Sequence, residues 1–527
     1  MLNLLRCAFI ACTLTPMWAC TASAEDGPER LFVQKLSSDK VTIKWRFADR
    51  QLERSSKACV STSQFSKLWP LRMLSNCVVA DVTADGHLEA SFEGLAPDTR
   101  YYYEVAGLYA ESYSFLTPTS QNGLPADGNT KILIVGDSGT QTSPKHDGEA
   151  QQVLDGYHAY NKINGDEAVD LFVALGDNAY VAGTDEQWQV AFFEVYNDIL
   201  RSAMVVPTIG NHEMGQGSFP CEAFHMCGER PPGTLVFYGG GSSSADPNSY
   251  DGNGDAEADS GGLPYLNIFS LPAAAESGGI ASGTEQYYSV DYNNVHIVSL
   301  DSQLSARDDA QRAAMKSWLE SDLMANDRDW TIVIFHHPPY SKATNHDSDT
   351  VERRGLTDLP QKLMREEFTP VFEQHGVDLV YSGHSHSYER SYYLKGLQST
   401  SDSMSDLKTY AELDEAGVPK VGRDSSFSQK SVTSGAVDDR VIYTVAGSSG
   451  KADRAPRGFD DPVTWLRHPA HVPQPADDLE NGCDSEHGCH HGLALKGSVV
   501  VDADDKTLRA RFVDVNGAVL DQVTIVR

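Results

Sequence analysis

Five short motifs with metal-ligand side chains follow hydrophobic segments of the chain, and their order constrains the fold more than any other feature. The hydrophobic segments, at residues 132–135, 171–175, 205–209, 331–335 and 378–381, are predicted to be buried strands. Polar residues just past such strands meet at one edge of an α/β sheet. Their carboxylates, amide, phenol and imidazoles are the ligand types of a two-metal hydrolytic site. The motifs are Gly136-Asp137-Ser138-Gly139, Gly176-Asp177-Asn178-Ala179-Tyr180, Gly210-Asn211-His212-Glu213, Val333-Ile334-Phe335-His336-His337-Pro338 and Gly383-His384-Ser385-His386.

Residues 131–527 are predicted to form one α/β domain. A further strand is expected at residues 295–300, and helical patterns lie between the strands. In residues 311–323, for example, Ala314, Trp318 and Leu319 recur at helical spacing. Alternation of strands and helices is typical of layered α/β domains. The last strands, at residues 499–501, 508–513 and 523–526, are assigned to the outer edge of this domain's sheet.

Residues 27–117 are predicted to be all-β. Val41, Ile43, Trp45 and Phe47 alternate with polar residues, which is the pattern of a half-buried strand. The turn at residues 95–99 and the Tyr-x-Tyr-x-Val strand after it resemble a fibronectin type III sandwich with its tyrosine corner. Residues 118–130 are rich in Gly, Pro, Asn and Ser and are interpreted as a linker.

Length and charge limit the function classes. A chain of 527 residues is too long for one ordinary core, so two or more domains are expected. The net charge of −32 repels phosphate backbones, so nucleic-acid binding is not expected. An anionic substrate would need local positive charge at its site, such as metal ions.

The N-terminus and the cysteines indicate export. Residues 1–24 are predicted to be a signal peptide that is cut after Ala24, and no later run approaches the about 18 apolar residues needed to span a membrane. Lipoprotein processing at Cys20 is the alternative. Removal of this segment leaves six cysteines in three local pairs, which favours disulfides in a secreted or periplasmic protein over free thiols. The pairs are Cys59 with Cys77, Cys221 with Cys227 and Cys483 with Cys489.

The five motifs, in this order, resemble those of the calcineurin-like metallophosphoesterases, and of the purple acid phosphatases most of all. Residues 383–390 resemble that family's extended fifth motif, and residues 516–521 resemble its closing strand pair. The resemblance implies an N-terminal β-sandwich and a catalytic domain built as a four-layer αββα sandwich.

The resemblance also implies a role for each site residue. It assigns Asp137, Tyr180 and His386 to a first metal, Asn211, His336 and His384 to a second, and Asp177 to a bridge between the two. It assigns His212 to substrate phosphate and the leaving oxygen, and His346 to a further substrate-side imidazole. The expected metals are Fe³⁺, which a Tyr phenolate favours, and a divalent Fe, Zn or Mn ion.

The predicted function is that of an acid-phosphatase-type hydrolase acting on small phosphate monoesters. The resemblance implies a dinuclear metal site and a metal-bound hydroxide as nucleophile. A phosphodiesterase or nucleotidase on the same metals is the first alternative. A non-catalytic secreted binding protein is the second, and its signature would be missing ligands, whereas all seven are present. The oligomeric state is left open.

Several neighbouring residues receive supporting roles. Glu213, Tyr388 and Glu389 are expected to hold ligands in place, as is His337 beside the ligand His336. Asp301, which also follows a strand, is expected to be structural.

Two further segments could bind metal. Asp251, Asn253 and Asp255 have the spacing of a calcium loop, but Gly262 stands where a bidentate Glu is needed, which favours a solvated acidic loop. A second group of histidines lies near Cys483 and Cys489, where a zinc site is conceivable and a surface loop over the cleft is the favoured interpretation. These histidines are His468, His471, His487, His490 and His491.

Overall fold

The computed structural model describes most of the chain after the N-terminal segment. The described residues are 28–48, 56–65, 76–83, 86–110, 113–142, 146–165, 168–214, 216–220, 235–239, 263–343, 346–349, 359–404, 406–428, 440–452, 466–474, 483–484 and 488–527. The predicted signal peptide, the Cys221–Cys227 pair and the calcium-like residues 251–255 lie outside them. No helix among the described residues is long and apolar enough to cross a membrane.

Residues 131–527 are the predicted catalytic part, and the first of its two large sheets, called the first catalytic sheet, combines parallel strands with the C-terminal hairpins. β9 (Thr130–Val135), β10 (Leu171–Ala174) and β11 (Met204–Pro207) are parallel. β23 (Gly497–Ala503) pairs with β9, and β24 (Thr507–Asp514), β25 (Val519–Val526) and β19 (Phe427–Ser428) extend the sheet to its edge. The C-terminal strands therefore lie at the outer part of this sheet, as predicted.

The second catalytic sheet has six strands. In order they are β14 (Tyr288–Tyr292), β15 (Val295–Ser299), β16 (Trp330–Ile334), β17 (Leu379–Ser382), β20 (Val441–Ala446) and β18 (Tyr388–Leu394). The four from β15 to β20 are parallel to one another. All the predicted strands of the catalytic part are present, whereas β14, β18 and β20 are additional.

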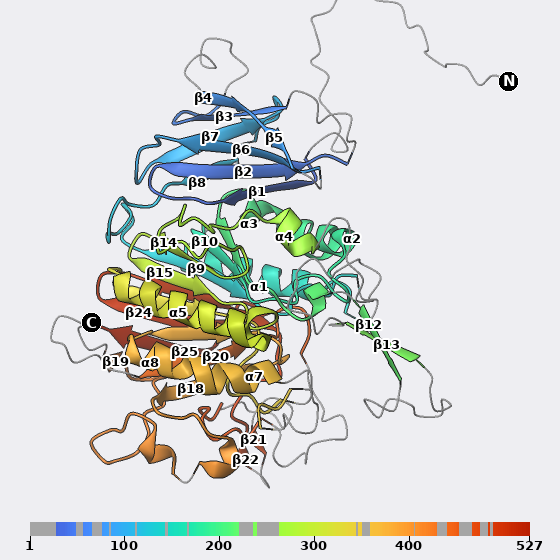
Figure 1. The fold of residues 1–527 in the computed structure, drawn as a ribbon. Coiled ribbons are helices and arrows are strands. Elements are labelled where there is room, and N and C mark those ends of the chain that lie inside the picture. The colour runs from blue at the N-terminus through green and yellow to red at the C-terminus, as the bar shows by residue number, and fades with distance from the viewer. Residues whose placement is uncertain are drawn as a thin grey trace, which may run out of the picture.

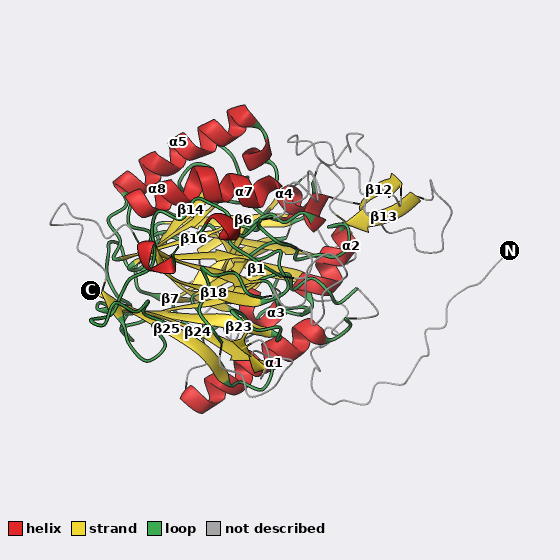
Figure 2. Cartoon of the chain, turned by 90° about the horizontal axis from the view of Figure 1, so that it is seen from below, coloured by secondary structure: helices red, strands yellow, loops and turns green. Residues whose placement is uncertain are grey.

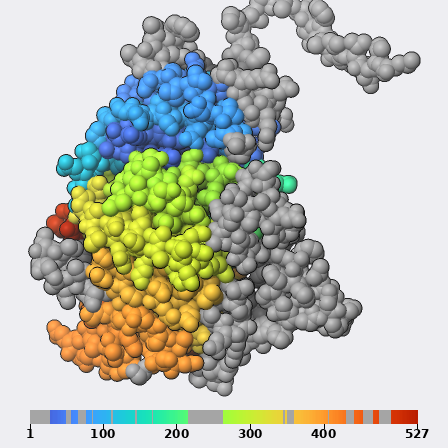
Figure 3. Space-filling model, in the orientation of Figure 1, coloured from blue at the N-terminus to red at the C-terminus, as the bar shows by residue number. Residues whose placement is uncertain are grey.

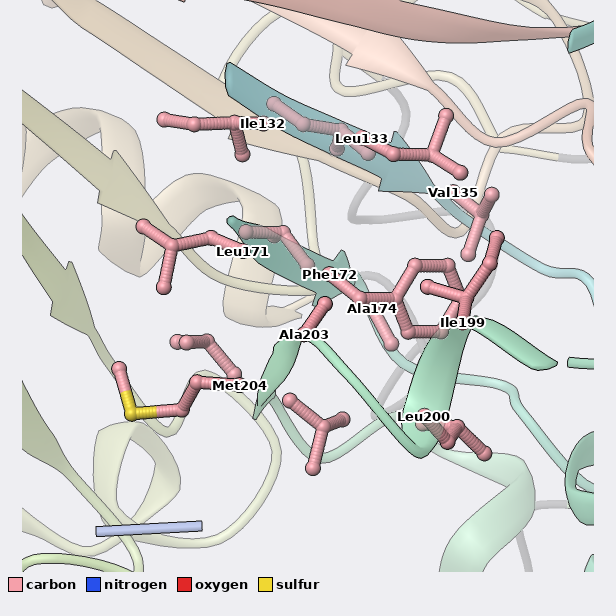
Figure 4. Close-up of a cluster of buried hydrophobic side chains, with 14 of the residues drawn as sticks. Ile132, Leu133, Val135, Leu171, Phe172, Ala174, Ile199, Leu200, Ala203 and Met204 are labelled. Carbon is pink, nitrogen blue, oxygen red and sulfur yellow. The ribbon is translucent and has the colours of Figure 1, made fainter. Parts of the chain in front are cut away.

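Both faces of the second sheet are covered because alternate side chains enter different cores. Ile332 and Ile334 belong to the hydrophobic cluster that also holds residues of the first sheet, such as Leu133. Val333 belongs to a second cluster with Trp318 of α5 (Asp309–Ala325). Successive strand side chains point to opposite faces, so the uniformly hydrophobic strands are covered on both sides. Figure 4 shows part of the first cluster, where β9, β10 and the segment before β11 pack together.

Helices flank the strands on two sides. Figure 2 shows α5, α7 (Leu359–Leu363) and α8 (Thr369–Gln374) along one side and α1 (Glu149–Asn164) along the other. The helix predicted at 311–323 is the interior of α5, which begins where the Asp308 carboxylate accepts from Ala310 N and Gln311 N. The shorter α-helices are α2 (Asp185–Trp188), α3 (Asn197–Leu200) and α4 (Pro264–Ile268). Single helical turns are the π-helical Gln189–Phe193 and Met364–Phe368 and the 3-10 turns His212–Met214, Ser305–Arg307, Ser401–Ser403 and Leu407–Thr409. Two separate strand pairs are β12 (Gln216–Pro220) with β13 (Leu235–Gly239) and β21 (Cys483–Asp484) with β22 (Gly488–Cys489).

In the N-terminal region, the described residues form strands and their connections, with no helix. β1 (Arg30–Gln34), β2 (Lys40–Arg46), β6 (Leu88–Glu93) and β5 (Asp81–Val82) follow one another in one sheet (Figure 1). β4 (Asn76–Val79), β3 (Lys57–Ser61), β7 (Arg100–Val105) and β8 (Ser114–Leu116) form another. A disulfide joins Cys59 to Cys77 across β3 and β4, which confirms that predicted pair. Cys483 and Cys489 face each other in the backbone register of β21 and β22.

The N-terminal region docks tightly on the catalytic part. β1 pairs in parallel with β11, so its sheet continues the first catalytic sheet into eleven strands. The prediction of a half-buried β2 is wrong, because its polar face is covered as well: Lys44 Nζ donates to Asn267 O and Ser270 Oγ. Figure 3 shows the atoms of the N-terminal region lying directly against those of the following part of the chain. β9 begins at Thr130, the last residue of the predicted linker.

Candidate metal centre

The polar residues of the five motifs lie where parallel strands of the two catalytic sheets end. One contact between the sheets is made by His336 Nδ1, which lies 2.8 Å from the backbone oxygen of Leu175. Because that oxygen can only accept, the ring donates from Nδ1 and keeps the lone pair of Nε2 for another partner. The motif residues and their strands are Asp137 after β9, Asp177 after β10, Asn211 after β11, His336 after β16 and His384 after β17.

Three of these residues adopt a backbone conformation that side chains other than glycine rarely take. The φ angles are 54° at Asp137, 54° at Asp177 and 69° at His384. Such residues cost about 1–3 kcal/mol each and persist where the surroundings fix them. One such restraint is the hydrogen bond of 2.7 Å from His384 N to Asp137 Oδ2. Part of the backbone strain of the protein is therefore located at residues of this site.

Glu213 holds the second and third motifs together, as predicted. Its carboxylate accepts from Gly210 N at 2.7 Å, Asp177 N at 2.9 Å and Asn178 N at 2.7 Å. Burial, together with the Asp177 charge, raises the pKa of this carboxyl to about 7. Because the Glu213 carboxylate accepts from three backbone N–H groups, it positions the second and third motifs and is not oriented to react with a substrate.

A first group of donor atoms surrounds the Tyr180 hydroxyl. This oxygen lies 3.0 Å from Asp137 Oδ1 and 3.0 Å from Asp177 Oδ2. His386 Nε2 lies 3.5 Å from the hydroxyl and 3.6 Å from Asp137 Oδ1. The phenol carries a single hydrogen, so it cannot donate to both carboxylates at once. Three oxygens and one nitrogen converge here in the manner that a shared cation requires.

A second group surrounds the Asn211 carbonyl oxygen. His384 Nδ1 lies 2.9 Å from it and His336 Nε2 lies 3.1 Å from it. His336 Nε2 is also 3.3 Å from Asp177 Oδ1. Because Nε2 of a neutral His336 is an acceptor, it faces two other acceptors, and either a proton or a cation must lie among them. The donor set of this group fits a transition metal.

Asp177 lies between the two groups. Its Oδ2 faces the Tyr180 hydroxyl and its Oδ1 faces His336 Nε2. Asp137, Asp177 and His336 also offer ligand atoms that all lie within 4.8 Å of one another. A carboxylate shared in this way can bridge two cations, which lie about 3.5–4 Å apart in two-metal sites. The residues therefore fit two metal ions with Asp177 in the middle.

The electrostatics of these side chains depend on one another. Burial raises the pKa of Asp137 to about 8, whereas the charges of His336 and His212 outweigh burial at Asp177 and hold its pKa well below the usual range. Burial would lower the pKa of His336, but the Asp177 carboxylate raises it to about 9. Burial and both carboxylates raise the pKa of Tyr180 well above 10.0. A bound cation reverses this balance, because it favours the deprotonated form of every ligand.

Two predicted substrate-side histidines border this cluster. His212 N donates to Asp177 Oδ1 at 2.8 Å, and the His212 ring packs 4.3 Å from the Tyr180 ring. His346 stacks on His384, with ring centroids 3.6 Å apart. Both imidazoles therefore lie beside predicted ligands, one next to each group of donor atoms.

His337 and Asp301 occupy the positions expected of supporting residues. His337 Nδ1 lies 2.9 Å from Ser302 Oγ, and its ring centroid is 4.4 Å from that of His384. The nitrogens of His336, His337 and His384 also lie within 4.8 Å of one another. Asp301 accepts from the backbone of the following turn, including Leu304 N at 2.7 Å.

The second histidine stretch is partly buried, so the surface-loop interpretation is wrong for His468 and His471. His471 Nδ1 lies 3.1 Å from Glu389 Oε2, and His468 Nε2 lies 3.9 Å from Asp349 Oδ1. Glu389 in turn accepts from Ser341 Oγ at 2.8 Å. These histidines therefore support the loops that carry the ligands. Across the described part of the chain, both groups of side chains suited to a metal belong to the five-motif site.

The sequence analysis missed one segment of the site, the loop after β20. Residues 447–451 read Gly-Ser-Ser-Gly-Lys, and Lys451 Nζ lies 3.7 Å from the centroid of the Tyr180 ring. The signal in the sequence was a hydrophobic run, Val441–Ala446, followed by two close glycines. It was overlooked because a single lysine is not a metal ligand.

Residues 130–388 match the family model of the calcineurin-like phosphoesterases. This stretch, just under half of the chain, includes all five motifs. Purple acid phosphatase 23 of Arabidopsis thaliana is 31% identical over 146 residues, which are 27% of this chain and 28% of that protein. Phosphoenolpyruvate phosphatase of Allium cepa is 31% identical over 136 residues, which are 25% of this chain and 24% of that protein. The chain thus aligns with only about a quarter of each of these two relatives.

The fold of the whole chain also has a solved counterpart. The purple acid phosphatase PPD1 from yellow lupin (Lupinus luteus) seeds superposes with a TM-score of 0.59. The superposition covers 94% of this chain and 74% of that one at 16% identity. At this identity the likeness establishes a shared mixed α/β fold with a β-rich N-terminal region.

Proposed function

We propose that the protein is a phosphate-monoester hydrolase of the acid-phosphatase type with a dinuclear metal site. The observation that supports this most directly is the position of Asp177, whose two oxygens face two separate groups of donor atoms. The phosphoesterase domain match and the purple acid phosphatase among the relatives point to the same chemistry.

In this proposal Asp137, Tyr180 and His386 hold one cation, and Asn211, His336 and His384 hold the other. Two bound cations supply a lowered pKa for attacking water and neutralise charge on the phosphoryl oxygens. The His212 Nε2 atom lies 3.8 Å from Asp177 Oδ2 at the edge of the site. Because His212 Nδ1 donates to Val181 O at 2.8 Å, Nε2 can donate to a leaving oxygen when both ring nitrogens are protonated. His346, stacked on His384, restricts the ring's orientation and borders the same substrate space.

The central test removes one ligand at a time. Asp177→Asn and His336→Ala are expected to lose at least about a hundredfold in turnover and to bind less metal, while far-UV circular dichroism stays unchanged. Asp309→Asn, an exposed carboxylate on α5, is the matched control. Near-normal phosphatase activity in either ligand variant would contradict the proposal.

The substrate class is tested separately. Hydrolysis of p-nitrophenyl phosphate is expected to exceed that of bis-p-nitrophenyl phosphate. The reverse order would favour the phosphodiesterase alternative on the same metals.

Tyr180 carries the narrower proposal of an Fe³⁺ ion at the first position. The wild-type protein is then expected to show a visible charge-transfer band, which Tyr180→Phe should abolish. Metal analysis of both proteins would show whether iron is retained. A colourless and active wild type would remove Tyr180 from the ligand set.

We further propose that residues 27–117 form a fibronectin-type sandwich, that residues 131–527 form a four-layer αββα domain, and that the mature protein is exported. The Tyr101 hydroxyl accepts from Ala96 N at 2.9 Å, as a tyrosine corner does.

The Cys59–Cys77 disulfide suits an oxidising compartment. A secreted protein whose N-terminal sequence begins at Glu25 would support export, and an uncleaved intracellular chain would refute it.

A further inference from the structure

The loop after β20 is fastened to the first and fifth motifs by backbone hydrogen bonds. Gly447 N donates to Ser387 O at 3.2 Å, and Ser449 N donates to Gly136 O at 3.0 Å. The carbonyl oxygen of Gly450 accepts from Thr140 Oγ1 at 2.8 Å. The loop thus joins the end of the second sheet to the end of the first, directly beside the candidate metal centre.

Close packing against Asp137 fixes this loop further. A Cβ atom at Gly447 would lie 2.2 Å from Ser385 O and 2.8 Å from Asp137 Oδ2. A Cβ atom at Gly450 would lie 2.6 Å from Asp137 O. These contacts are too short for any side chain, so the backbone approaches the carboxylate as closely as glycine permits. The backbone of Lys451, the next residue, is therefore held in a fixed position at the edge of the site.

The Lys451 side chain extends over Tyr180. Its ammonium lies 3.7 Å from the centroid of the Tyr180 ring, within the range of a cation–π contact. The His212 ring packs on the same tyrosine at 4.3 Å. The ammonium therefore lies beside the proposed ligand Tyr180, whose ring also contacts the proposed proton donor His212.

We propose that Lys451 is a specificity-determining residue that binds the phosphate of the substrate and favours the doubly charged monoester. The protein has a net charge of −32, so a phosphate approaching it is repelled until it reaches a local positive charge. A fixed ammonium attracts a dianion about twice as strongly as a monoanion, because the Coulomb energy is proportional to the charge. Lys451 would in this way discriminate monoesters from diesters. The inference rests on the proposed function and deepens it.

The test compares Lys451→Gln with the wild type. The affinity for inorganic phosphate, measured by calorimetry on the metal-loaded protein, is expected to fall about tenfold to a hundredfold, as for the loss of one charge-assisted hydrogen bond. KM for p-nitrophenyl phosphate should rise by a similar factor, and KM for bis-p-nitrophenyl phosphate should change much less. Lys451→Arg should restore most of the phosphate affinity.

Lys420 offers a matched control, because its ammonium also lies over an aromatic ring, 5.1 Å from the centroid of Phe427. Lys420→Gln removes the same charge from the protein and should leave every parameter unchanged. Equal phosphate affinity in the wild type and Lys451→Gln would overturn the inference. So would a shifted visible band with unchanged KM, since Lys451 would then act on Tyr180 alone. A wild type that binds phosphate but hydrolyses neither ester would count against the proposed function, while the affinity comparison still decides the role of Lys451.

Discussion

At the scale of single residues, His296 shows how a buried charge is stabilised away from the metal centre. The imidazole lies between two carboxylates, with Nδ1 at 2.7 Å from Asp291 Oδ1 and Nε2 at 2.9 Å from Asp322 Oδ2. Both ring nitrogens donate only when the ring is protonated. Burial alone would lower the pKa of His296, but the two hydrogen bonds and charges raise it to about 9 from 6.5.

This contact predicts a specific pH dependence of stability. Because the folded pKa exceeds the unfolded one, the contribution is complete below pH 6.5 and is lost as the pH rises toward about 9. His296→Gln should cost about 3 kcal/mol at pH 6 and much less at pH 9.5, measured by urea unfolding. His158→Gln, at an exposed position on α1, is the control. A cost that does not depend on pH would contradict the charged state.

Each residue of the candidate metal centre lies in a short local motif, so the sequence alone predicts it as a ligand, and that role stays a prediction. Lys451 could not be found in the same way, because its proposed role depends on Tyr180, far away in the sequence. The burial of His468 and His471 could not be predicted for a related reason. The polar composition of their segment indicates a surface loop, whereas Glu389 provides a buried partner for the His471 imidazole.

At the scale of elements, the proposed function depends on loops that follow strands, and the loop after β20 has no room for added volume. Gly447→Ala would place a Cβ atom 2.2 Å from Ser385 O, so the backbone next to Asp137 must shift. A displacement of this kind can cost about a hundredfold in turnover. Steady-state assays should show that loss. Gly123→Ala, where the nearest atom would be 3.4 Å away, should have normal activity. Full activity of Gly447→Ala would show that the loop does not position the site.

The parallel strands β9, β10, β11, β15, β16 and β17 could be predicted from their hydrophobic runs, since both of their faces are buried. β2 could not, because its alternating pattern implies one exposed face. The structure instead covers the polar face with hydrogen-bond partners such as Asn267 and Ser270, which lie more than two hundred residues further along the chain. β18 is polar enough, with Glu389, Arg390 and Ser391, to escape detection by hydrophobicity.

At the scale of the whole molecule, one buried carboxylate links the two catalytic sheets. Asp521 of β25 accepts from Arg390 Nε at 2.6 Å and from Tyr388 Oη at 2.8 Å, both on β18. Arg423 Nε donates to it at 3.0 Å. Asp521 and Arg390 are each only 1% exposed, so neither charge can turn to water.

Removal of this carboxylate should therefore destabilise the whole domain. Asp521→Ala leaves the Arg390 guanidinium buried without its counter-ion and is expected to cost about 3–5 kcal/mol of unfolding free energy. Urea unfolding followed by circular dichroism would measure the loss. The exposed Asp505→Ala should stay within about 0.5 kcal/mol of the wild type. An equally small effect for both variants would show that the network adds nothing.

The pairing of β1 with β11 could not be predicted, since hydrophobic periodicity reveals strands but not which distant strands pair. Val33 lies opposite Met204 in this register. A chain from which residues 28–117 are deleted is expected to aggregate, which light scattering would detect, because the edge of β11 would be exposed. A monodisperse deletion variant would contradict this.

The pairing of β1 with β11 gives the β-rich N-terminal region a structural role that does not depend on binding a ligand. Open edges of sheets recruit the strands of other molecules, and proteins protect them in different ways. In this protein the edge of β11 is covered by the folded N-terminal region, which pairs with it through β1. The unit covers the edge of β11, so insertions in its distal loops should be tolerated better than changes on the face that bears β1.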